Sequence, residues 1–175
     1  MCDEALARMR GAVALAPKNA DLCANLGQAL QICGDAKEAA AAYREAVALA
    51  PGDPGFRNNL AVALVAAGDL EGAEAEAREA AKLDPSAARY LVNLGYVLHR
   101  RGDEAGAEAT LRKCLGIDPA SPDAHNQLGV VLEAVGRNDE ARAEFRKALD
   151  LDPEHSGAAE NLRAHEKVSR NEAYG

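Results

Sequence analysis

Amide side chains recur every 34 residues along this chain, at Asn25, Asn59, Asn93, Gln127 and Asn161. A primary amide can donate and accept hydrogen bonds at the same time. A row of amides on one surface could therefore bind the N–H and C=O groups of an extended peptide backbone without reading its side chains. The alternative is that these amides brace adjacent helices or face water, and the sequence favours neither interpretation.

A second candidate site is a local cluster of basic and aromatic residues: Arg89, Tyr96, His99 and Arg100. In a chain with a formal net charge of −8, this cluster predicts a docking point for an acidic or C-terminal group. The alternative is a patch that only water contacts.

Catalytic motifs are absent from the sequence. It contains no Gly-x-Ser-x-Gly, no phosphate-binding loop and no His-Glu-x-x-His. The histidines at 99, 125, 155 and 165 do not pair at the spacing of metal ligands on one helix face. We therefore predict that the protein is not an enzyme and has no catalytic residue, cofactor or metal site.

The four cysteines are Cys2, Cys23, Cys33 and Cys114, and none forms a Cys-x-x-Cys pair. This spacing favours scattered thiols in a reducing compartment. A disulfide between Cys2 and Cys33 is the alternative, since both are expected near the ends of helices.

Prolines and glycines recur at the same spacing as the amides and predict the helices that carry these side chains. Glycine allows the left-handed residue that closes a helix, and proline prevents a helix from continuing. Aspartates after three of the glycines are expected N-caps, and Glu38 gives Asp35 a capping box. The glycines are Gly34, Gly68, Gly102 and Gly136, the prolines Pro17, Pro51, Pro85, Pro119 and Pro153, and the aspartates Asp35, Asp69 and Asp103.

Small residues inside the predicted helices indicate that neighbouring helices approach closely. Gly27, Gly95 and Gly129 each cost about 1 kcal/mol relative to alanine in a helix interior. Close packing is the simplest compensation. Each repeat of 34 residues is thus expected to consist of a helix, a tight turn and a second helix.

The pattern resembles the tetratricopeptide repeat, in which Trp, Leu-Gly and Tyr mark the first helix, Ala and Phe the second, and Pro the end. The first repeat has Cys23, Leu26-Gly27, Leu30, Ala39, Tyr43 and Pro51 at these positions. The fourth repeat has His125, Leu128-Gly129, Leu132, Ala141, Phe145 and Pro153. The Trp position departs from the pattern and holds Cys23, Arg57, Leu91 and His125. The second repeat has Ala61 in place of Gly and Ala77 in place of Phe.

The resemblance implies an all-α fold, an α-α superhelix of the tetratricopeptide repeat solenoid type. We expect four full repeats between an N-terminal half-repeat and a C-terminal capping helix. The expected divisions are 1–19 for the half-repeat, then 20–53, 54–87, 88–121 and 122–155, with a capping helix at 156–168 and a flexible tail at 169–175.

In this family the first helices line a concave groove, so the resemblance implies a peptide-binding surface there. Asp21 and Gln31 belong to the groove-facing set of the first unit. The predicted peptide-binding residues are Asn25, Gln28, Asn58, Asn59, Val62, Arg89, Asn93, Tyr96, His99, Arg100, Asn126, Gln127 and Asn161.

We therefore expect a non-catalytic module that binds an extended peptide or partner segment. A substrate-recruiting arm of a larger, transferase-type enzyme and a self-associating scaffold are the alternatives. Leu6, Met9 and Val13 lie on one helical stripe, and we expect part of it to lack cover. This would favour a homodimer or a missing preceding repeat.

Charge and hydropathy limit the classes of partner. An isoelectric point near 5.0 argues against nucleic acid. No apolar run approaches the roughly 18 residues of a membrane span. The acidic N-terminus lacks the apolar core of a secretion signal, so we expect a cytoplasmic protein.

Overall fold

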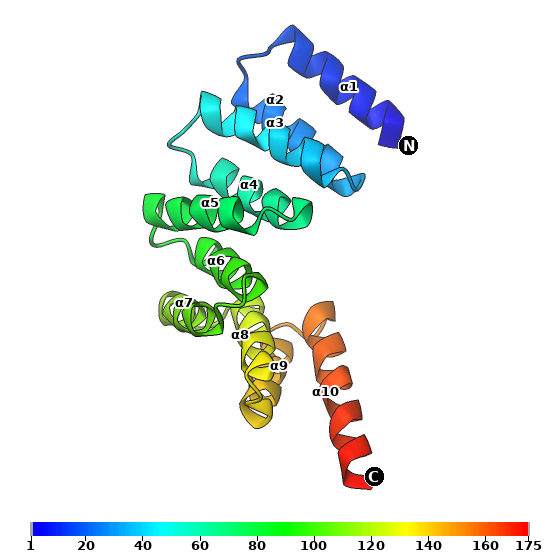
Figure 1. The fold of residues 1–175 in the computed structure, drawn as a ribbon, viewed down its shortest axis with the longest axis vertical. Helices are drawn as coiled ribbons and strands as arrows, with labels where there is room; N and C mark the ends of the chain where they lie inside the picture. Colours follow the sequence, from blue (N-terminus) through cyan, green and yellow to red (C-terminus); the bar gives the residue numbers. More distant parts are fainter. Residues whose placement is uncertain (1, 175) are drawn as a thin grey trace. The chain divides into compact units, whose positions relative to one another are not determined.

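A computed structural model describes the backbone of residues 2–174 and the side chains of residues 2–165. Over this range the regular structure is entirely helical (Figure 1). The ten helices are α1 (Cys2–Leu15), α2 (Ala20–Ile32), α3 (Ala36–Leu49), α4 (Pro54–Ala67), α5 (Leu70–Leu83), α6 (Ala88–Arg100), α7 (Glu104–Ile117), α8 (Pro122–Ala134), α9 (Asn138–Leu151) and α10 (Ser156–Tyr174).

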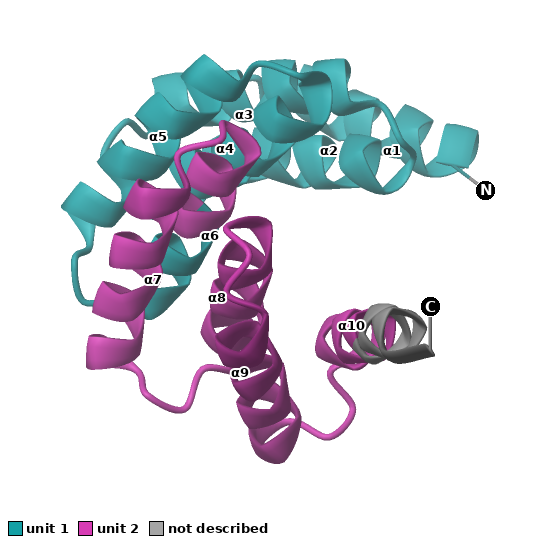
Figure 2. Ribbon diagram, turned by 60° about the horizontal axis from the view of Figure 1, so that its bottom comes forward, with its two compact units in different colours: residues 1–93 teal, residues 94–175 magenta. Residues whose placement is uncertain are grey.

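The chain forms two units, residues 1–93 and 94–175, with the boundary inside α6 (Figure 2). In unit 1, helices that are consecutive in the chain pack against each other from α1 to α5. In unit 2, α7 packs on α8, α8 on α9, and α10 contacts both α8 and α9. Each unit is therefore a stack of helical hairpins.

The turns within the hairpins form as the glycines predict. Gly34, Gly68, Gly102 and Gly136 have φ between 79° and 89°, the left-handed region that a side chain disfavours. The next backbone N–H then donates to a carbonyl of the last helical turn, as from Asp69 to Leu64 at 2.9 Å. This bond closes the helix and turns the chain back at once.

The predicted N-caps are confirmed at two of three positions. Asp69 and Asp103 each accept a bond from a backbone N–H in the first turn, at 2.9 Å. The Asp35 side chain makes no such bond, so the capping box predicted there is wrong. Glu38 instead accepts a hydrogen bond of 2.6 Å from Arg10 in α1, which draws its carboxylate away from the helix terminus.

The helix-interior glycines lie against large side chains, as their cost predicted. A Cβ built on Gly27 would lie 3.0 Å from the ring of Tyr43, and one on Gly95 would lie 2.6 Å from Leu111. The second repeat replaces both members of this pair, with Ala61 and Ala77 buried. A larger residue in the first helix is thus matched by a smaller one in the second.

Helix α1 is held by few buried side chains. Leu6 is its one buried residue among those described, while Met9 and Val13 are half-buried. We expected part of this stripe to lack cover, and Met9 and Val13 keep some exposed surface, whereas Leu6 packs against its own unit. Leu15, outside the stripe, is 90% exposed.

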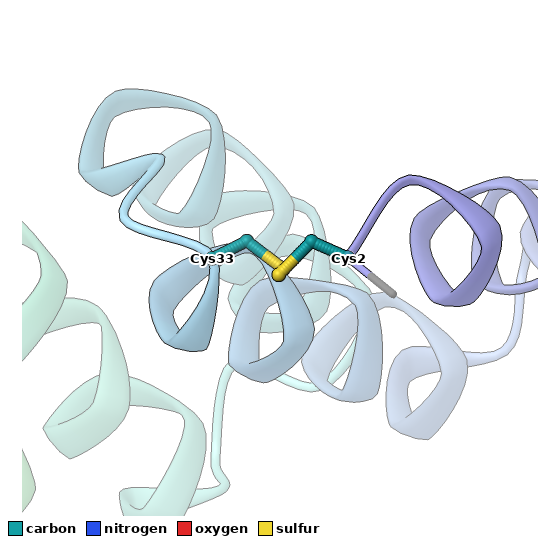
Figure 3. Close-up of a disulfide and its surroundings, with 2 residues drawn as sticks. All are labelled: Cys2 and Cys33. Carbon is teal, nitrogen blue, oxygen red and sulfur yellow. A yellow bond between two sulfur atoms is a disulfide. The ribbon is translucent and has the colours of Figure 1, made fainter.

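A disulfide joins Cys2 to Cys33, with their Cα atoms 5.9 Å apart (Figure 3). Cys2 begins α1 and Cys33 caps the end of α2, so the two antiparallel helices bring these residues together. The expectation of four separate thiols is corrected here in favour of the alternative.

Helix α10 extends to Tyr174, beyond residue 168, where we expected the capping helix to end and a flexible tail to begin. Residues 166–174 contain no proline or glycine that would end a helix. Ala158 and His165 are the buried residues of the described part of this helix.

Candidate functional site

Unit 1 has a hollow of about 400 Å³ on the surface formed by its first helices. Residues of α2, α4 and α6 line it, together with Tyr43 of α3. The lining residues are Asp21, Ala24, Asn25, Gln28, Gln31, Tyr43, Phe56, Asn58, Asn59, Val62 and Asn93. Six of the predicted groove residues are therefore brought together in one place.

Two amides of the hollow are bonded to each other. The Asn93 side-chain nitrogen donates to the Asn58 side-chain oxygen at 2.7 Å and joins α6 to α4. Unit 2 repeats the contact at the equivalent positions, where Asn161 donates to Asn126 at 3.0 Å. These amide pairs therefore brace helices against each other, which is the alternative to peptide binding that the sequence left open.

Three other amides of the hollow keep their hydrogen-bonding capacity. Asn25, Gln28 and Asn59 are exposed, and their side chains make no hydrogen bond within the described part of the chain. They come from two neighbouring first helices, α2 and α4. Together they present donors and acceptors to whatever enters the hollow.

Aromatic side chains complete the hollow. Tyr43 lines the hollow from α3 and is buried, and its hydroxyl donates to the Gln31 side-chain oxygen at 3.5 Å. Phe56, at the start of α4, is half-buried and leaves part of its ring accessible. The sequence pattern did not predict Tyr43 and Phe56 as site residues, because aromatic residues at these positions are expected to pack between helices.

The predicted basic cluster divides between the two units, with Arg89 in unit 1 and Tyr96, His99 and Arg100 in unit 2. In unit 1, Arg89 donates to the Tyr90 hydroxyl at 2.6 Å and lies 4.6 Å from the centre of its ring. In unit 2, Arg100 donates to the Tyr96 hydroxyl at 2.7 Å, and His99 Nδ1 lies 2.7 Å from Glu104.

Both arginines thus contact a phenol instead of a carboxylate. The hydrogen bond to Tyr90 raises the pKa of Arg89 above its ordinary value. The remaining predicted residues, Asn126, Gln127 and Asn161, lie in unit 2, and Asn126 is buried.

The position that the family assigns to tryptophan carries a polar bridge in alternate repeats. Arg57 contacts Glu76 at 2.7 Å and the carbonyl of Pro51 at 3.0 Å. His125 contacts the equivalent partners, Glu144 at 2.6 Å and the carbonyl of Pro119 at 3.2 Å. A side chain of this position therefore ties the first helix to the second helix and to the preceding turn.

The buried thiols lack the character of nucleophiles. Burial raises the pKa of the Cys114 thiol to about 11, with a further contribution from Asp118. Burial and then Glu45 raise the pKa of Cys23. Thiols in this state stay protonated at neutral pH.

No group of histidine, cysteine and acidic residues that could hold a metal ion occurs among the residues that the structure describes. In the same part of the chain, no helix has both the length and the apolar character needed to cross a bilayer.

Stacked antiparallel hairpins with a repeated packing pair define a helical-repeat protein, an all-α solenoid. Three models described as "Tetratricopeptide repeat" match the chain, at residues 20–53, 58–122 and 98–165. The chain belongs to the tetratricopeptide repeat family. No curated protein matches it.

Solved structures share this fold at low sequence identity. TTC0263, a thermophilic TPR protein of Thermus thermophilus, is 24% identical, with a TM-score of 0.80 over 94% of this chain and 90% of that chain. MamA is 23% identical, with a TM-score of 0.74 over 87% and 89%. YrrB, described as a TPR protein with an unusual peptide-binding site, is 21% identical, with a TM-score of 0.70 over 93% and 84%.

Proposed function

We propose that the hollow of unit 1 binds an extended segment of a partner protein. The observation that carries this proposal is the set of three unbonded amides, Asn25, Gln28 and Asn59, around a hollow with a partly accessible Phe56. Amides suit a peptide backbone, which offers one donor and one acceptor at most residues. A solved structure with the same fold, YrrB, is described as having a peptide-binding site, which supports this assignment.

The role we propose is non-catalytic. The hollow contains one carboxylate, that of Asp21, and its described lining has no histidine or cysteine. General acid–base and nucleophilic catalysis need such groups in contact with the reacting atoms. Binding and positioning a partner are what these side chains can do.

Capture of the partner from an extract of the source organism tests the proposal. Immobilised wild-type protein is compared with the triple variant Asn25→Ala, Gln28→Ala, Asn59→Ala. We expect at least one protein to be retained by the wild type and lost with the variant, and peptides from that protein to bind in solution.

Asn138→Ala is the matched control, because Asn138 is an exposed amide of α9 that lies in unit 2 and does not line the hollow of unit 1. Identical retention by the wild type and the triple variant would show that the hollow does not bind the partner.

Self-association through α1 is a second candidate. This helix bears a shallow hollow of about 400 Å³ lined by Glu4, Ala5, Arg8 and Met9. Met9 and Val13 are half-buried and keep part of their surface available, whereas Leu6 is already buried. Light scattering coupled to size exclusion tests this candidate: Met9→Glu is expected to dissociate a dimer, and a monomer at all concentrations removes the candidate.

The disulfide bears on where the protein works. Disulfides persist in oxidising compartments and are rare in the reducing cytoplasm, so the Cys2–Cys33 bond opposes the cytoplasmic location that we expected from the sequence. We propose an oxidising compartment. Thiol labelling of the protein in intact cells of the source organism distinguishes the two, since only reduced Cys2 and Cys33 react.

A further inference from the structure

We infer that the hollow of unit 1 selects a partner segment with a positively charged side chain, a lysine or an arginine, placed beside Asp21. This inference rests on the proposed function and names the chemistry of its partner. It follows from the charges around the hollow, the form of its apolar wall and the charge of the whole chain.

Asp21 supplies the negative charge of the hollow. It lies in the first turn of α2, is exposed and lines the hollow. Its carboxylate makes no ion pair within the described residues. An acidic side chain near a helix N-terminus is compatible with the positive end of the helix dipole, so Asp21 is open to a cation from a partner.

The residues that line the hollow also disfavour a negatively charged ligand. None of the described residues that line the hollow is a lysine or an arginine. Arg57, on α4, is engaged by Glu76 and the Pro51 carbonyl, and Arg89 by the Tyr90 hydroxyl. A carboxylate entering the hollow would therefore meet the charge of Asp21 without a cation to compensate it.

The apolar part of the hollow fits the stem of a long basic side chain. Phe56 and Val62 are half-buried, and both line the hollow on α4. Lysine and arginine bury their methylene groups along such surfaces while the charged end stays near water. Asn25, Gln28 and Asn59 would then hold the backbone on either side of this residue.

The charge of the whole chain acts in the same direction. A formal net charge of −8 attracts cationic segments over a longer range and raises the rate of encounter. Salt screens this attraction, whereas it does not screen the hydrogen bonds between the side-chain amides and the peptide backbone. Binding should therefore weaken, without being abolished, as the salt concentration rises.

Selection from a phage library of random linear peptides tests the inference without a known partner. Wild-type protein is the target, and the triple variant Asn25→Ala, Gln28→Ala, Asn59→Ala removes peptides that bind elsewhere. We expect lysine and arginine to be enriched over aspartate and glutamate in the peptides that remain.

Fluorescence polarisation with a selected, labelled peptide then locates the charge. Asp21→Asn is expected to weaken binding by up to about fivefold, the upper end of the range for an exposed ion pair. Glu71→Gln is the matched control, because Glu71 is an exposed carboxylate of α5 that does not line the hollow. Replacing the basic residue of the peptide with glutamine should remove the difference between wild type and Asp21→Asn.

The outcomes separate the two claims. Selected peptides without enrichment of basic residues, or equal effects of Asp21→Asn and Glu71→Gln, would overturn the inference and leave the proposed function in place. Failure to select any peptide that distinguishes the wild type from the triple variant would contradict the proposed function, and the inference with it.

Discussion

Gly129 in α8 lies directly against the ring of Phe145 in α9, so that a Cβ built on the glycine would lie 2.5 Å from a ring carbon. Both residues are buried, and Phe145 has no exposed surface. The ring therefore occupies the space that a side chain at position 129 would need. The same relationship recurs in the first repeat between Gly27 and Tyr43.

Gly129→Ala is expected to destabilise the protein by about 1–3 kcal/mol, the usual cost of an overpacked core. Gly116→Ala is the control, because Gly116 is also helical, in α7, and has no atom within 4 Å of a built Cβ. The control should be neutral or stabilising by up to about 1 kcal/mol. Urea unfolding of both variants measures the contrast, and equal midpoints would contradict the packing account.

The N-caps predict a second contrast. Asp103→Ala removes a side-chain bond to the Gly106 N–H and should cost about 0.5–2 kcal/mol. Asp35→Ala removes no such bond and should cost less than about 0.5 kcal/mol. Thermal unfolding of the two variants checks the difference, and an equally large loss in Asp35→Ala would show that Asp35 caps α3 in solution.

The amides of the hollow should separate into bracing and binding residues. Asn58→Ala leaves the Asn93 amide without its partner and should cost about 1 kcal/mol of stability. Asn59→Ala, the adjacent exposed residue, should change stability by less than about 0.5 kcal/mol and weaken peptide binding. Unfolding curves and peptide titrations on the same two samples measure this, and a large stability loss in Asn59→Ala would assign it to bracing.

Reduction of the disulfide should loosen α1. The cross-link spans 31 residues, and closing a loop of that size contributes about 3–4 kcal/mol in the chain-entropy account. Because Leu6 is the one buried residue of α1 among those described, we expect faster hydrogen exchange of α1 amides in the presence of a dithiol. The Cys2→Ser variant should exchange equally fast without reductant and show no further change with it. Unchanged protection of α1 on reduction would mean that packing alone holds the helix.

Acid should destabilise the folded protein through Glu144. Burial favours a raised pKa at this residue, but hydrogen bonds from Lys147 and His125 lower the pKa below its ordinary value of 4.5. Such a group contributes its full stabilisation above the unfolded-state pKa and loses it as the pH falls through the folded-state pKa.

Stability should therefore decline below about pH 4.5, and Glu144→Gln should make that decline shallower. Urea midpoints from neutral to acidic pH measure the slope. Glu133→Gln, at an exposed glutamate of α8 without an ion pair among the described residues, should keep the wild-type slope. An unchanged slope in Glu144→Gln would show that other carboxyl groups cause the acid loss.

The sequence predicted the hairpins because their signals are local. A glycine such as Gly68 with Asp69 after it specifies a turn and an N-cap within a short segment. The choice of Asn25, Gln28 and Asn59 had another basis, because the resemblance to the family implied which face of the first helices lines the groove; all three line the hollow.

Side-chain partners across helices could not be predicted in the same way. Whether Asn93 meets Asn58, or Glu38 meets Arg10, depends on differences of about 1 Å in how two helices approach. One signal for such partners is present in the sequence: polar residues, Arg57 and His125, occupy the tryptophan position at twice the repeat length, and Glu76 and Glu144 recur at the same separation.

The alternation of braced and unbraced positions determines how this chain can be lengthened. Arg57 with His125, and Asn58 with Asn126, are counterparts separated by two repeat lengths. If a copy of residues 54–121 were inserted after residue 121, the copied Arg57 and Asn58 would have the same hydrogen-bond partners as the originals. A copy of the single repeat 88–121 at the same place would instead set its Asn93 opposite Val92, which cannot accept a hydrogen bond through its side chain. A pair of repeats is therefore the increment that preserves these contacts.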